Sequence, residues 1–259
     1  MVFVTTSRKP GEEVRTEAQG LADKIGAPLL PRESFSLAKM FEMSGSGEAI
    51  IVGPGGARWQ DAGGKEFFFH PNMAAVRVKE LSRGGTDALV EAAGIQSGDR
   101  VLDCTLGLGS DAIVAAHVVG ETGKVTGLES QPVIAALVAH GLTTYRSDSP
   151  RLKRAMRRVR VHCADYREVL SSCPDDAYDI VFFDPMFRYT VSRSSGVQAL
   201  KTLANPAPLG PSSVAEAKRV ARRRVILKER KMSGEFERLG FRVVKEASNH
   251  AFGVLDCGR

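Results

Sequence analysis

Short apolar runs alternate with helical patterns from about residue 100 to residue 240, and this alternation constrains the fold more than any other feature. The runs are bounded by turn residues, as strands are, and the stretches between them have the length and periodicity of helices. Strands that alternate with helices form a mainly parallel sheet covered on both faces. The last two runs, "FRVVKEA" and "AFGVLD", follow each other across a short turn that contains Ser248 and Asn249, which predicts an antiparallel hairpin.

The first 70 residues follow a different pattern and predict a small α+β domain. "VFVTT" and "AIIVG" are strand-like, and "GEEVRTEAQGLADKIGA" between them carries its apolar residues on one helical face. "ARWQDAGGKEFFFH" predicts a hairpin around two glycines, with Trp59 in the core. We therefore expect a small N-terminal α+β domain over residues 1–70 and a larger α/β domain over residues 71–259.

Length and composition limit the kinds of protein that this chain can be. With 259 residues, of which 43% are hydrophobic and 25% charged, the chain is long enough to bury a core. No apolar run approaches the roughly 18 residues of a membrane span, and the N-terminus lacks the apolar core of a secretory signal. We expect a cytoplasmic protein that does not contact a membrane.

The four cysteines stand apart from one another. They form no C-x-x-C motif and no cluster with the spacing of a zinc site, so we expect no metal. Cys104 and Cys163 lie in strand-like runs, where a free cysteine behaves as a small core residue.

Much of the positive charge lies in two runs, in a chain whose net charge is +6. "RLKRAMRRVR", residues 151–160, has Lys or Arg at six of ten positions, and "KRVARRRVILKERK", residues 218–231, has them at eight of fourteen. Such runs form either the solvated ends of helices and strands or a surface that binds a phosphate backbone. The three arginines at 222–224 directly precede an apolar strand, so some of them mark its exposed entry.

The segment "VLDCTLGLGSDA" predicts a buried strand, a tight turn and the start of a helix. Glycine permits a close approach of the backbone to a ligand, so Gly107 and Gly109 are candidates for cofactor binding. The pattern matches the dinucleotide fingerprint G-x-G-x-x-A, but an acid before a glycine-rich turn also suits S-adenosylmethionine (SAM). Asp103 would lie near the SAM ammonium, whereas Asp111 would repel a pyrophosphate. We also expect Ser110 and Asp111 to cap the helix.

The next two strands also end in acids. Glu129 can accept both hydroxyls of a ribose, which either cofactor contains. Asp165 can accept a hydrogen bond from an adenine amino group, and it can equally cap the helix that follows.

The fourth strand ends in "FFDPMF", the most informative stretch of the chain. Pro185 fixes a backbone dihedral, so that the Asp184 carboxylate and nearby main-chain carbonyls form a rigid acceptor site for an exocyclic amine. Phe187 can stack on a base. A dinucleotide dehydrogenase has no use for such a group. We therefore assign Asp184, Pro185, Met186 and Phe187 to catalysis and favour SAM over NAD(P).

These motifs resemble those of class I SAM-dependent methyltransferases, which implies a Rossmann-like, mainly parallel sheet. Within that class the chain looks like the family that methylates a guanine N2 in RNA of the bacterial small ribosomal subunit. "LDCTLGLGSDA" is similar to that family's "DATAGLGRDA", "LESQPVIAALVAHGL" resembles its "LERNPVVAALLxxGL", and "DPMF" looks like its form of the catalytic motif. By this resemblance, the residues that contact SAM are Ser110, Asp111, Glu129, Ser130, Ala164, Asp165 and Asp184.

The chain departs from that family mainly where the substrate would lie. Ser110 and Ser130 stand at positions of arginine, and Asp165 stands at a position of serine. The residues after "DPMF" are not the family's Pro-His-Lys. We assign Arg188, the first of them, to substrate binding. Lys228, which ends the fifth strand, is a further candidate as a phosphate contact.

A weaker resemblance lies at the N-terminus. "TSRKP", a helix and "PRESFSL" follow the order found at the start of Brix-type ribosome-biogenesis domains. This resemblance implies RNA contacts by Arg8, Lys9 and Arg32. Together with the basic runs, it favours RNA, and ribosomal RNA in particular, as the partner.

The prediction is a SAM-dependent methyltransferase that methylates an exocyclic amine of a nucleobase in RNA, with guanine N2 of ribosomal RNA favoured. Three other functions stay open: a methyltransferase of a small molecule or protein, an NAD(P)-binding oxidoreductase, and a non-catalytic RNA factor that binds SAM. Methyl transfer to RNA separates the favoured function from all three.

Overall fold

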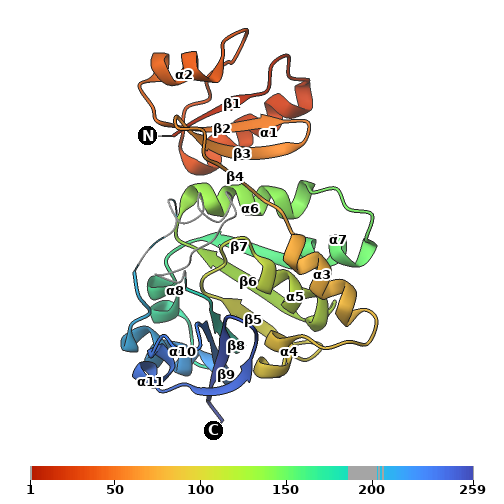
Figure 1. Cartoon of the computed structure of the whole chain (residues 1–259), viewed down its shortest axis with the longest axis vertical. Helices are drawn as coiled ribbons and strands as arrows, with labels where there is room; N and C mark the ends of the chain where they lie inside the picture. Colours follow the sequence, from red (N-terminus) through yellow and green to blue (C-terminus); the bar gives the residue numbers. More distant parts are fainter. Residues whose placement is uncertain (1, 186–202, 204, 206, 259) are drawn as a thin grey trace. The chain divides into compact units, whose positions relative to one another are not determined.

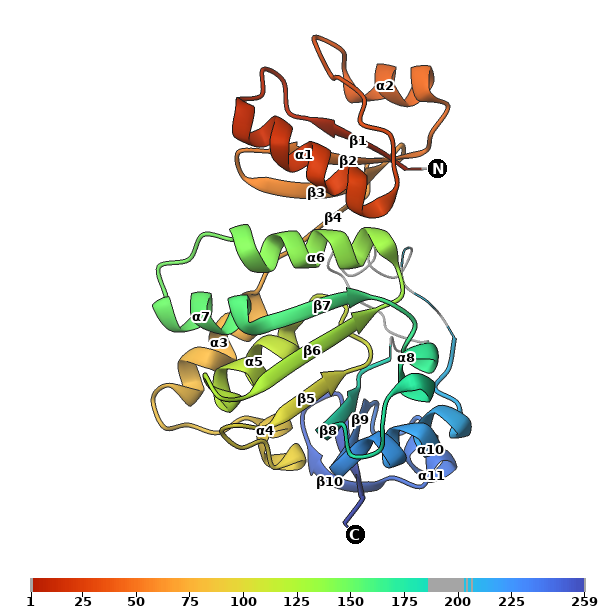
Figure 2. The same cartoon turned by 180° about the vertical axis from the view of Figure 1, so that it is seen from behind.

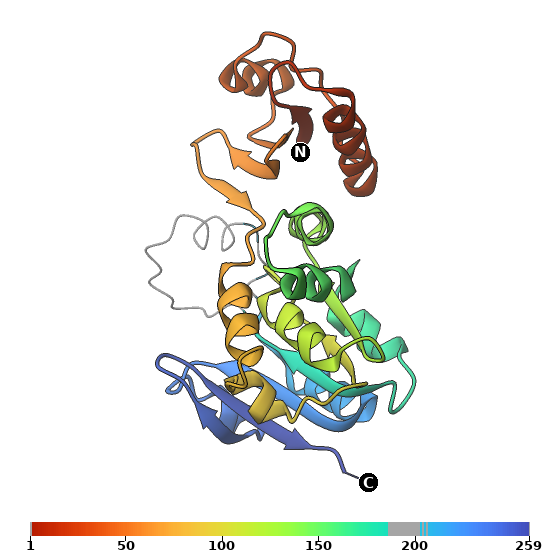
Figure 3. The same cartoon turned by 90° about the vertical axis from the view of Figure 1, so that its right-hand side faces the viewer.

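The computed structural model describes residues 2–185, 203, 205 and 207–258, and Figures 1 to 3 show it from three sides. Contacts between Cα atoms divide the chain into two compact units. Unit 1 contains the described residues of Met1–His70 and Pro132–Tyr145. Unit 2 contains those of Pro71–Gln131, Arg146–Thr190 and Asn205–Arg259.

Unit 2 is built on a mainly parallel sheet, whose described strands have the order β10-β11-β9-β8-β5-β6-β7. The parallel strands are β5 (Arg100–Asp103), β6 (Lys124–Glu129), β7 (Val159–Cys163), β8 (Tyr178–Phe183) and β9 (Ala221–Glu229). β10 (Arg242–Glu246) and β11 (Ala251–Asp256) are antiparallel to each other, and β11 pairs with β9. The predicted parallel sheet and its C-terminal antiparallel hairpin are thus confirmed.

Helices cover both faces of this sheet (Figures 1 and 2). α4 (Ala88–Ala93) and α5 (Ser110–Val119) pack on one face. α8 (Tyr166–Ser172), α10 (Pro211–Val220) and α11 (Glu235–Leu239) pack on the other. α3 (Asn72–Leu81) and α7 (Pro150–Arg158) pack on α5.

The strands of unit 2 bury both faces because their side chains alternate in direction. Val101, Ile180 and Phe182 line a small cavity together with residues of α4 and α5. The residues that follow them along the strands belong to the core cluster beneath α8, α10 and α11; they are Leu102, Val181 and Phe183. A strand residue of this sheet therefore points toward α5 or toward α10 according to its position in the alternation.

Unit 1 contains a sheet whose described strands have the order β1-β2-β3-β4. β1 (Phe3–Thr6) runs parallel to β2 (Glu48–Gly53), while β3 (Gly56–Asp61) and β4 (Glu66–Phe68) complete it as antiparallel strands. Trp59 is fully buried, as the sequence predicts.

The helices of unit 1 begin and end at sequence signals. α1 (Glu12–Ile25) ends at Gly26, which has the left-handed conformation of a C-cap glycine. α2 (Leu37–Ser44) begins at Ser36, whose hydroxyl accepts the N–H of Lys39. α1 is where the sequence predicts it.

α6 (Pro132–Thr144) groups with unit 1, although the sequence assigns it to the domain over residues 71–259. It packs against β3 and α1. Gly141 also lets α6 approach Phe69, which follows β4, because a Cβ atom at position 141 would lie only 2.3 Å from the Phe69 ring. The packing of α6 thus depends on a contact between two residues that are 72 positions apart in the chain. The periodicity of the sequence does not reveal such a long-range contact.

The basic run at residues 151–160 includes the end of α7, at Arg158, and the start of β7, at Val159. One feature of unit 2 differs from the sequence prediction. Cys163 was expected in the core but is exposed, since β7 is an edge strand of the described sheet. Cys104, at the centre of the sheet, is buried as expected. No described helix has the length and apolar character needed to cross a membrane.

Candidate functional site

Polar side chains from three strands gather on the α5 face of the unit 2 sheet, at the carboxyl ends of its central strands. Asp103 ends β5, Asp184 follows β8, and Lys228 lies near the end of β9. The register of these strands directs all three side chains toward α5, where Asp111 lies in the first helical turn. The carboxyl ends of parallel strands are where α/β proteins bind ligands, so this is the candidate site.

The Lys228 ammonium lies between two carboxylates. Its Nζ atom is 2.8 Å from Oδ2 of Asp111 and 2.7 Å from Oδ2 of Asp184, and 17% of the lysine side chain is exposed. From the sequence, Lys228 is a candidate phosphate contact. In the structure its charge is instead matched within the protein, so that the lysine holds Asp111 and Asp184 at a fixed separation.

Arg77 joins the same network from α3. It lies 2.5 Å from Oδ1 of Asp111 and forms a bidentate pair with Asp87, at 2.7 and 2.9 Å. Asp87 also accepts the N–H groups of the first turn of α4. A guanidinium thus connects three helices beside the candidate site. The sequence interpretation missed Arg77. A signal existed, because Arg77 is a charged residue beside the apolar stripe that Ala74 and Val78 form.

Burial and neighbouring charges set the ionisation of the three acids. Burial, reinforced by the carboxylates of Asp111 and Asp184, raises the pKa of Asp103 well above its ordinary value. Burial also raises the pKa of Asp184, although the Lys228 ammonium opposes it. For Asp111, Lys228 and Arg77 together outweigh burial and hold the pKa below its ordinary range. One firmly ionised carboxylate therefore lies beside two that take up protons more readily.

The turn after β5 needs its glycines. Gly107 and Gly109 have φ angles of 49° and 72°, in the left-handed region that a side chain disfavours. Glu129, at the end of β6, accepts the N–H of Gly107 at 3.2 Å and that of Gln131 at 2.9 Å, one on each carboxylate oxygen. Burial raises the pKa of Glu129 against the effect of these donors.

The expectation that Ser110 or Asp111 caps α5 is wrong. Gly109 is the N-cap residue, and none of the described side chains accepts an N–H group there. The Asp111 carboxylate is taken by Lys228 and Arg77, which bind it more strongly than a backbone N–H would. Within the part of the chain that the structure describes, the first N–H groups of α5 thus have no side-chain acceptor, as at helix starts that bind an anionic group.

Asp165 caps α8, one of the two roles that the sequence predicts for it. It accepts the N–H of Arg167 at 2.8 Å, and a further hydrogen bond from the Arg167 guanidinium lowers the pKa of Asp165. Its neighbour Ala164 donates its N–H to the carbonyl of Glu129 at 3.0 Å. Ala164 and Asp165 therefore lie beside Glu129 and Ser130, at the ends of adjacent strands.

Thr105 fixes the backbone at Asp184. Its hydroxyl accepts the Asp184 N–H at 2.6 Å, and its own N–H donates to Oδ1 of Asp103 at 3.1 Å. Nothing in the sequence distinguishes Thr105, because its partner is 79 positions away. Pro185 is half-buried. The other predicted residues of this stretch lie outside the described part of the chain; they are Met186, Phe187 and Arg188.

These groups fit SAM. Each carboxylate oxygen of Glu129 accepts one N–H and retains a lone pair for a ribose hydroxyl. Asp103 is a buried acid whose raised pKa a nearby ammonium would lower again. The uncapped start of α5 offers N–H donors to a carboxylate. The ammonium, carboxylate and ribose of SAM therefore each find a chemically matched group.

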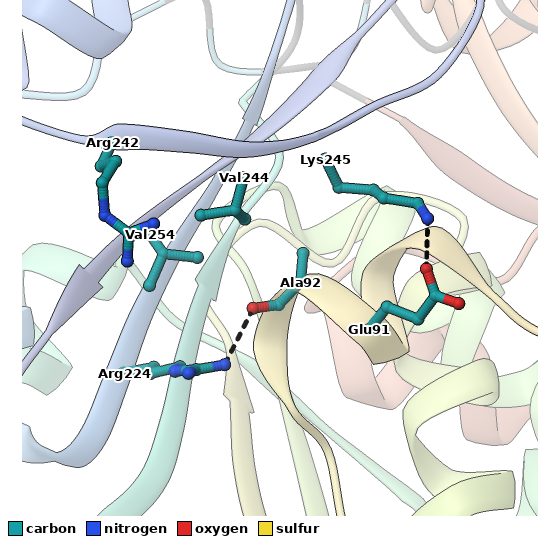
Figure 4. Close-up of a pocket in the computed structure, with 7 residues that line it drawn as sticks. All are labelled: Glu91, Ala92, Arg224, Arg242, Val244, Lys245 and Val254. Atoms are coloured by element: carbon teal, nitrogen blue, oxygen red, sulfur yellow. Dashed lines mark hydrogen bonds and ion pairs between the residues drawn. The ribbon is translucent and has the colours of Figure 1, made fainter.

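A separate hollow of about 360 Å³ lies between α4 and the C-terminal strands (Figure 4). Its charged side chains already have partners: Lys245 pairs with Glu91, while Arg224 and Arg242 share Asp256, each at 3.0 Å. Arg224 also donates to the Ala92 carbonyl at 3.2 Å. Because these charges are satisfied within the protein, we assign the hollow no ligand.

Comparisons with known proteins identify the family of the chain. The chain is 38% identical to the "Uncharacterized protein YpiP" of Bacillus subtilis, over 98% of both chains. It is 31% identical to "Ribosomal RNA small subunit methyltransferase J" of Dechloromonas aromatica, over 78% of this chain and 85% of that protein. A crystal structure of a SAM-dependent methyltransferase from Neisseria gonorrhoeae shares the fold, with a TM-score of 0.64 and 17% identity, over 99% of this chain and 96% of that one.

Of the two cofactors compatible with the glycine-rich turn, these comparisons support SAM. The model of the family described as "Putative SAM-dependent methyltransferase" matches residues 66–255, a range that contains the residues of the candidate site. The chain therefore belongs to this family of SAM-dependent methyltransferases, with a Rossmann-like fold and S-adenosylmethionine as its cofactor.

Proposed function

We propose that this methyltransferase modifies an exocyclic amine of a nucleobase in RNA, with guanine N2 of small-subunit ribosomal RNA as the favoured target. The observation that carries the proposal is the placement of Asp184. Its N–H is held by Thr105 and its Oδ2 by Lys228, and it is followed by a proline at a strand end. A carboxylate held in this way is a fixed acceptor for N–H groups, as the orientation of an amine requires.

Asp184 is the proposed catalytic residue. With Oδ2 occupied by Lys228, the other oxygen, Oδ1, accepts an N–H of the amine and directs the nitrogen lone pair toward the cofactor. When bound, SAM supplies a methyl group that the amine nitrogen takes in exchange for a proton. Pro185 stiffens the acceptor site, and Met186 and Phe187 complete it in this proposal. Lys228 acts through Asp184 and is a positioning residue.

The proposed cofactor contacts follow the strand ends. Asp103 receives the ammonium, the turn at Gly107 and Gly109 lies along the cofactor, and Glu129 binds the ribose. The remaining proposed contacts come from the same edge of the sheet; they are Ser110, Asp111, Ser130, Ala164 and Asp165.

Two observations support RNA as the substrate class. Curated relatives of this chain, at about 30% identity, are named for methylation of small-subunit ribosomal RNA. The chain is also basic, with a calculated isoelectric point of about 9.2, as expected for a protein that binds a polyanion. The resemblance of the N-terminal segment to Brix-type domains points to the same partner and stays a prediction.

The test is transfer of radiolabelled methyl from SAM to ribosomal subunits, transfer RNA and a protein fraction. We expect label in small-subunit RNA, in a methylated guanine after digestion to nucleosides. Asp184→Ala should lose transfer while still binding SAM, and Asp148→Ala, which removes an exposed acid, serves as the matched control. Normal turnover by Asp184→Ala would refute the catalytic assignment. Label in protein alone, or none in RNA, would refute the RNA substrate.

A further inference from the structure

The basic run at residues 151–160 differs from the other basic run in its electrostatic surroundings. Arg158 pairs with Glu121 at 3.1 Å. Within the described residues, no carboxylate lies at ion-pair distance from the other basic side chains of the run, which are Arg151, Lys153, Arg154, Arg157 and Arg160. In the run at 218–231, by contrast, at least six of the eight basic side chains have carboxylate partners.

α7 presents these charges on one face. Leu152, Ala155 and Met156 are buried, and through them the helix packs on α5 and α3 (Figures 1 and 3). Arg154 and Arg157, three positions apart, are exposed on the opposite side. The apolar face is used by the core, and within the described residues Arg154 and Arg157 have no carboxylate partner that would hold the helix on the protein.

Fold stability does not explain the basic residues near the start of α7. Arg151 and Lys153 lie within the first turns, where no acidic residue is present. Cations there face the positive end of the helix dipole and are unfavourable. Stability would place acids at these positions, and Lys or Arg only in the last turn, where Arg157 and Arg158 are found.

Neighbouring helices extend the positive region. Lys79 is exposed on α3, and Arg83 is exposed just after its C-cap residue Ser82, whose carbonyl accepts a hydrogen bond from Arg151 of α7 at 3.3 Å. The positive potential also acts on His117 of α5. Burial lowers the pKa of His117, and the charges of Arg151, Arg158 and Arg154 lower it further. The region defined by Arg83, Arg151, Lys153, Arg154 and Arg157 is named the α7 basic face.

We propose that the α7 basic face binds the phosphate backbone of the RNA substrate at a distance from the methylated base. The inference rests on the proposed function. α7 ends where β7 begins, and the five residues of β7 lead to the candidate site at its carboxyl end. At a strand rise of about 3.3 Å per residue, β7 spans roughly 13 Å between the end of α7 and the site. A polymer such as RNA can contact both ends of the strand at once.

The test uses the full chain with Arg154 and Arg157 both replaced by glutamine, R154Q/R157Q. The matched control is K218Q/R242Q, which removes two exposed charges from α10 and β10 of the same unit. Affinity for transcribed small-subunit ribosomal RNA is measured across a salt series, and methyl transfer is measured on that RNA and on a short oligonucleotide that contains the target base.

We expect R154Q/R157Q to weaken RNA binding about tenfold or more and to flatten the salt slope by about two, since each lost phosphate contact removes close to one unit of slope. KM should rise for the long RNA, with kcat, SAM affinity and turnover of the short oligonucleotide unchanged. An unchanged salt slope, or an equal loss in K218Q/R242Q, would overturn the proposal.

The same variants distinguish this proposal from others. If the wild-type chain methylates no RNA, the proposed function fails; if it methylates RNA and R154Q/R157Q behaves as wild type, only the α7 basic face is refuted. Vesicles with phosphatidylserine provide a third measurement. A loss of vesicle binding with intact RNA binding would assign the face to a membrane surface and overturn the RNA proposal.

Discussion

β9 and α7 each carry a dense run of Lys and Arg, but the charges of the two elements meet different surroundings. The arginines at the start of β9 reach acids of neighbouring strands: Arg222 pairs with Asp179 of β8, and Arg224 with Asp256 of β11. Further along, Lys228 enters the candidate site. On α7, among the described residues, Arg158 has the one carboxylate partner.

The difference follows from the position of each element in the sheet. β9 lies between β8 and β11, so acids on either side can reach its side chains. α7 leads into β7, an edge strand of the described sheet, and its outer face meets solvent. Similar compositions therefore serve different purposes: paired cations hold the fold and the site together, and unpaired cations are available to a partner.

The largest effect is expected at Arg77, a paired cation outside both runs. Arg77→Met removes the guanidinium that Asp87 and Asp111 share. Only 20% of the Arg77 side chain is exposed, so the two carboxylates lose a largely buried partner. The free energy of unfolding of unit 2 should fall by about 3 kcal/mol, because a largely buried charge loses its partner. Denaturant unfolding measures this, with the exposed Lys79→Met on the same helix as a control that changes little.

The loss of unfolding free energy in Arg77→Met should depend on pH. The pKa of Asp111 is held below its ordinary value, so its stabilising effect is present above the unfolded pKa of about 4 and is lost as pH falls. The difference between wild type and Arg77→Met should therefore be largest near pH 7 and shrink below about pH 4. A constant difference across this range would show that the guanidinium acts by packing alone.

Lys228→Met tests whether a paired cation of β9 positions Asp184, the proposed catalytic residue. Loss of the ammonium frees Asp184 to move, and kcat should fall by about 100-fold. Lys228 lowers the pKa of Asp184, so its removal should shift the acid limb of the kcat profile to higher pH. Lys228→Arg, which retains the charge, should recover part of the rate with the limb near its wild-type position. If kcat falls in Lys228→Met but the acid limb of its pH profile stays in place, Lys228 has a purely structural role.

Arg223→Gln tests a paired cation away from the site. Arg223 binds Asp99, whose side chain is 9% exposed and also accepts the N–H of Gln96. The unfolding free energy should fall by about 2 kcal/mol because Asp99 loses its only cation among the described residues. Affinity for RNA should stay unchanged in this variant. Weaker RNA binding by correctly folded Arg223→Gln would blur the distinction between the two runs.

The smallest effect on stability is expected for Arg154→Gln on α7. The Arg154 side chain is exposed and has no carboxylate partner in the described part of the chain. The free energy of unfolding should therefore change by less than about 0.5 kcal/mol. A melting temperature several degrees lower would mean that the α7 run stabilises the fold and would remove the contrast with β9.

Local pattern accounts for most of the fold. Short apolar runs and helical stretches predict the parallel strands, their helices and the C-terminal hairpin, because such patterns are properties of neighbouring residues. The same reasoning misplaces Cys163, since periodicity cannot distinguish a central strand from an edge strand. It also leaves α6 in the second domain, because its packing on β3 and α1 is a long-range contact.

The candidate site, too, has some features that the sequence predicts and others that only the tertiary structure shows. The sequence by itself determined that acids stand at successive strand ends and that glycines follow the first, since strand ends and turns are local features. Tertiary structure alone decided that Lys228 lies between Asp111 and Asp184 and that Arg77 completes the network, across separations of up to 117 residues. The physical reason is that an ion pair depends on strand register and helix placement, which no short stretch of sequence contains.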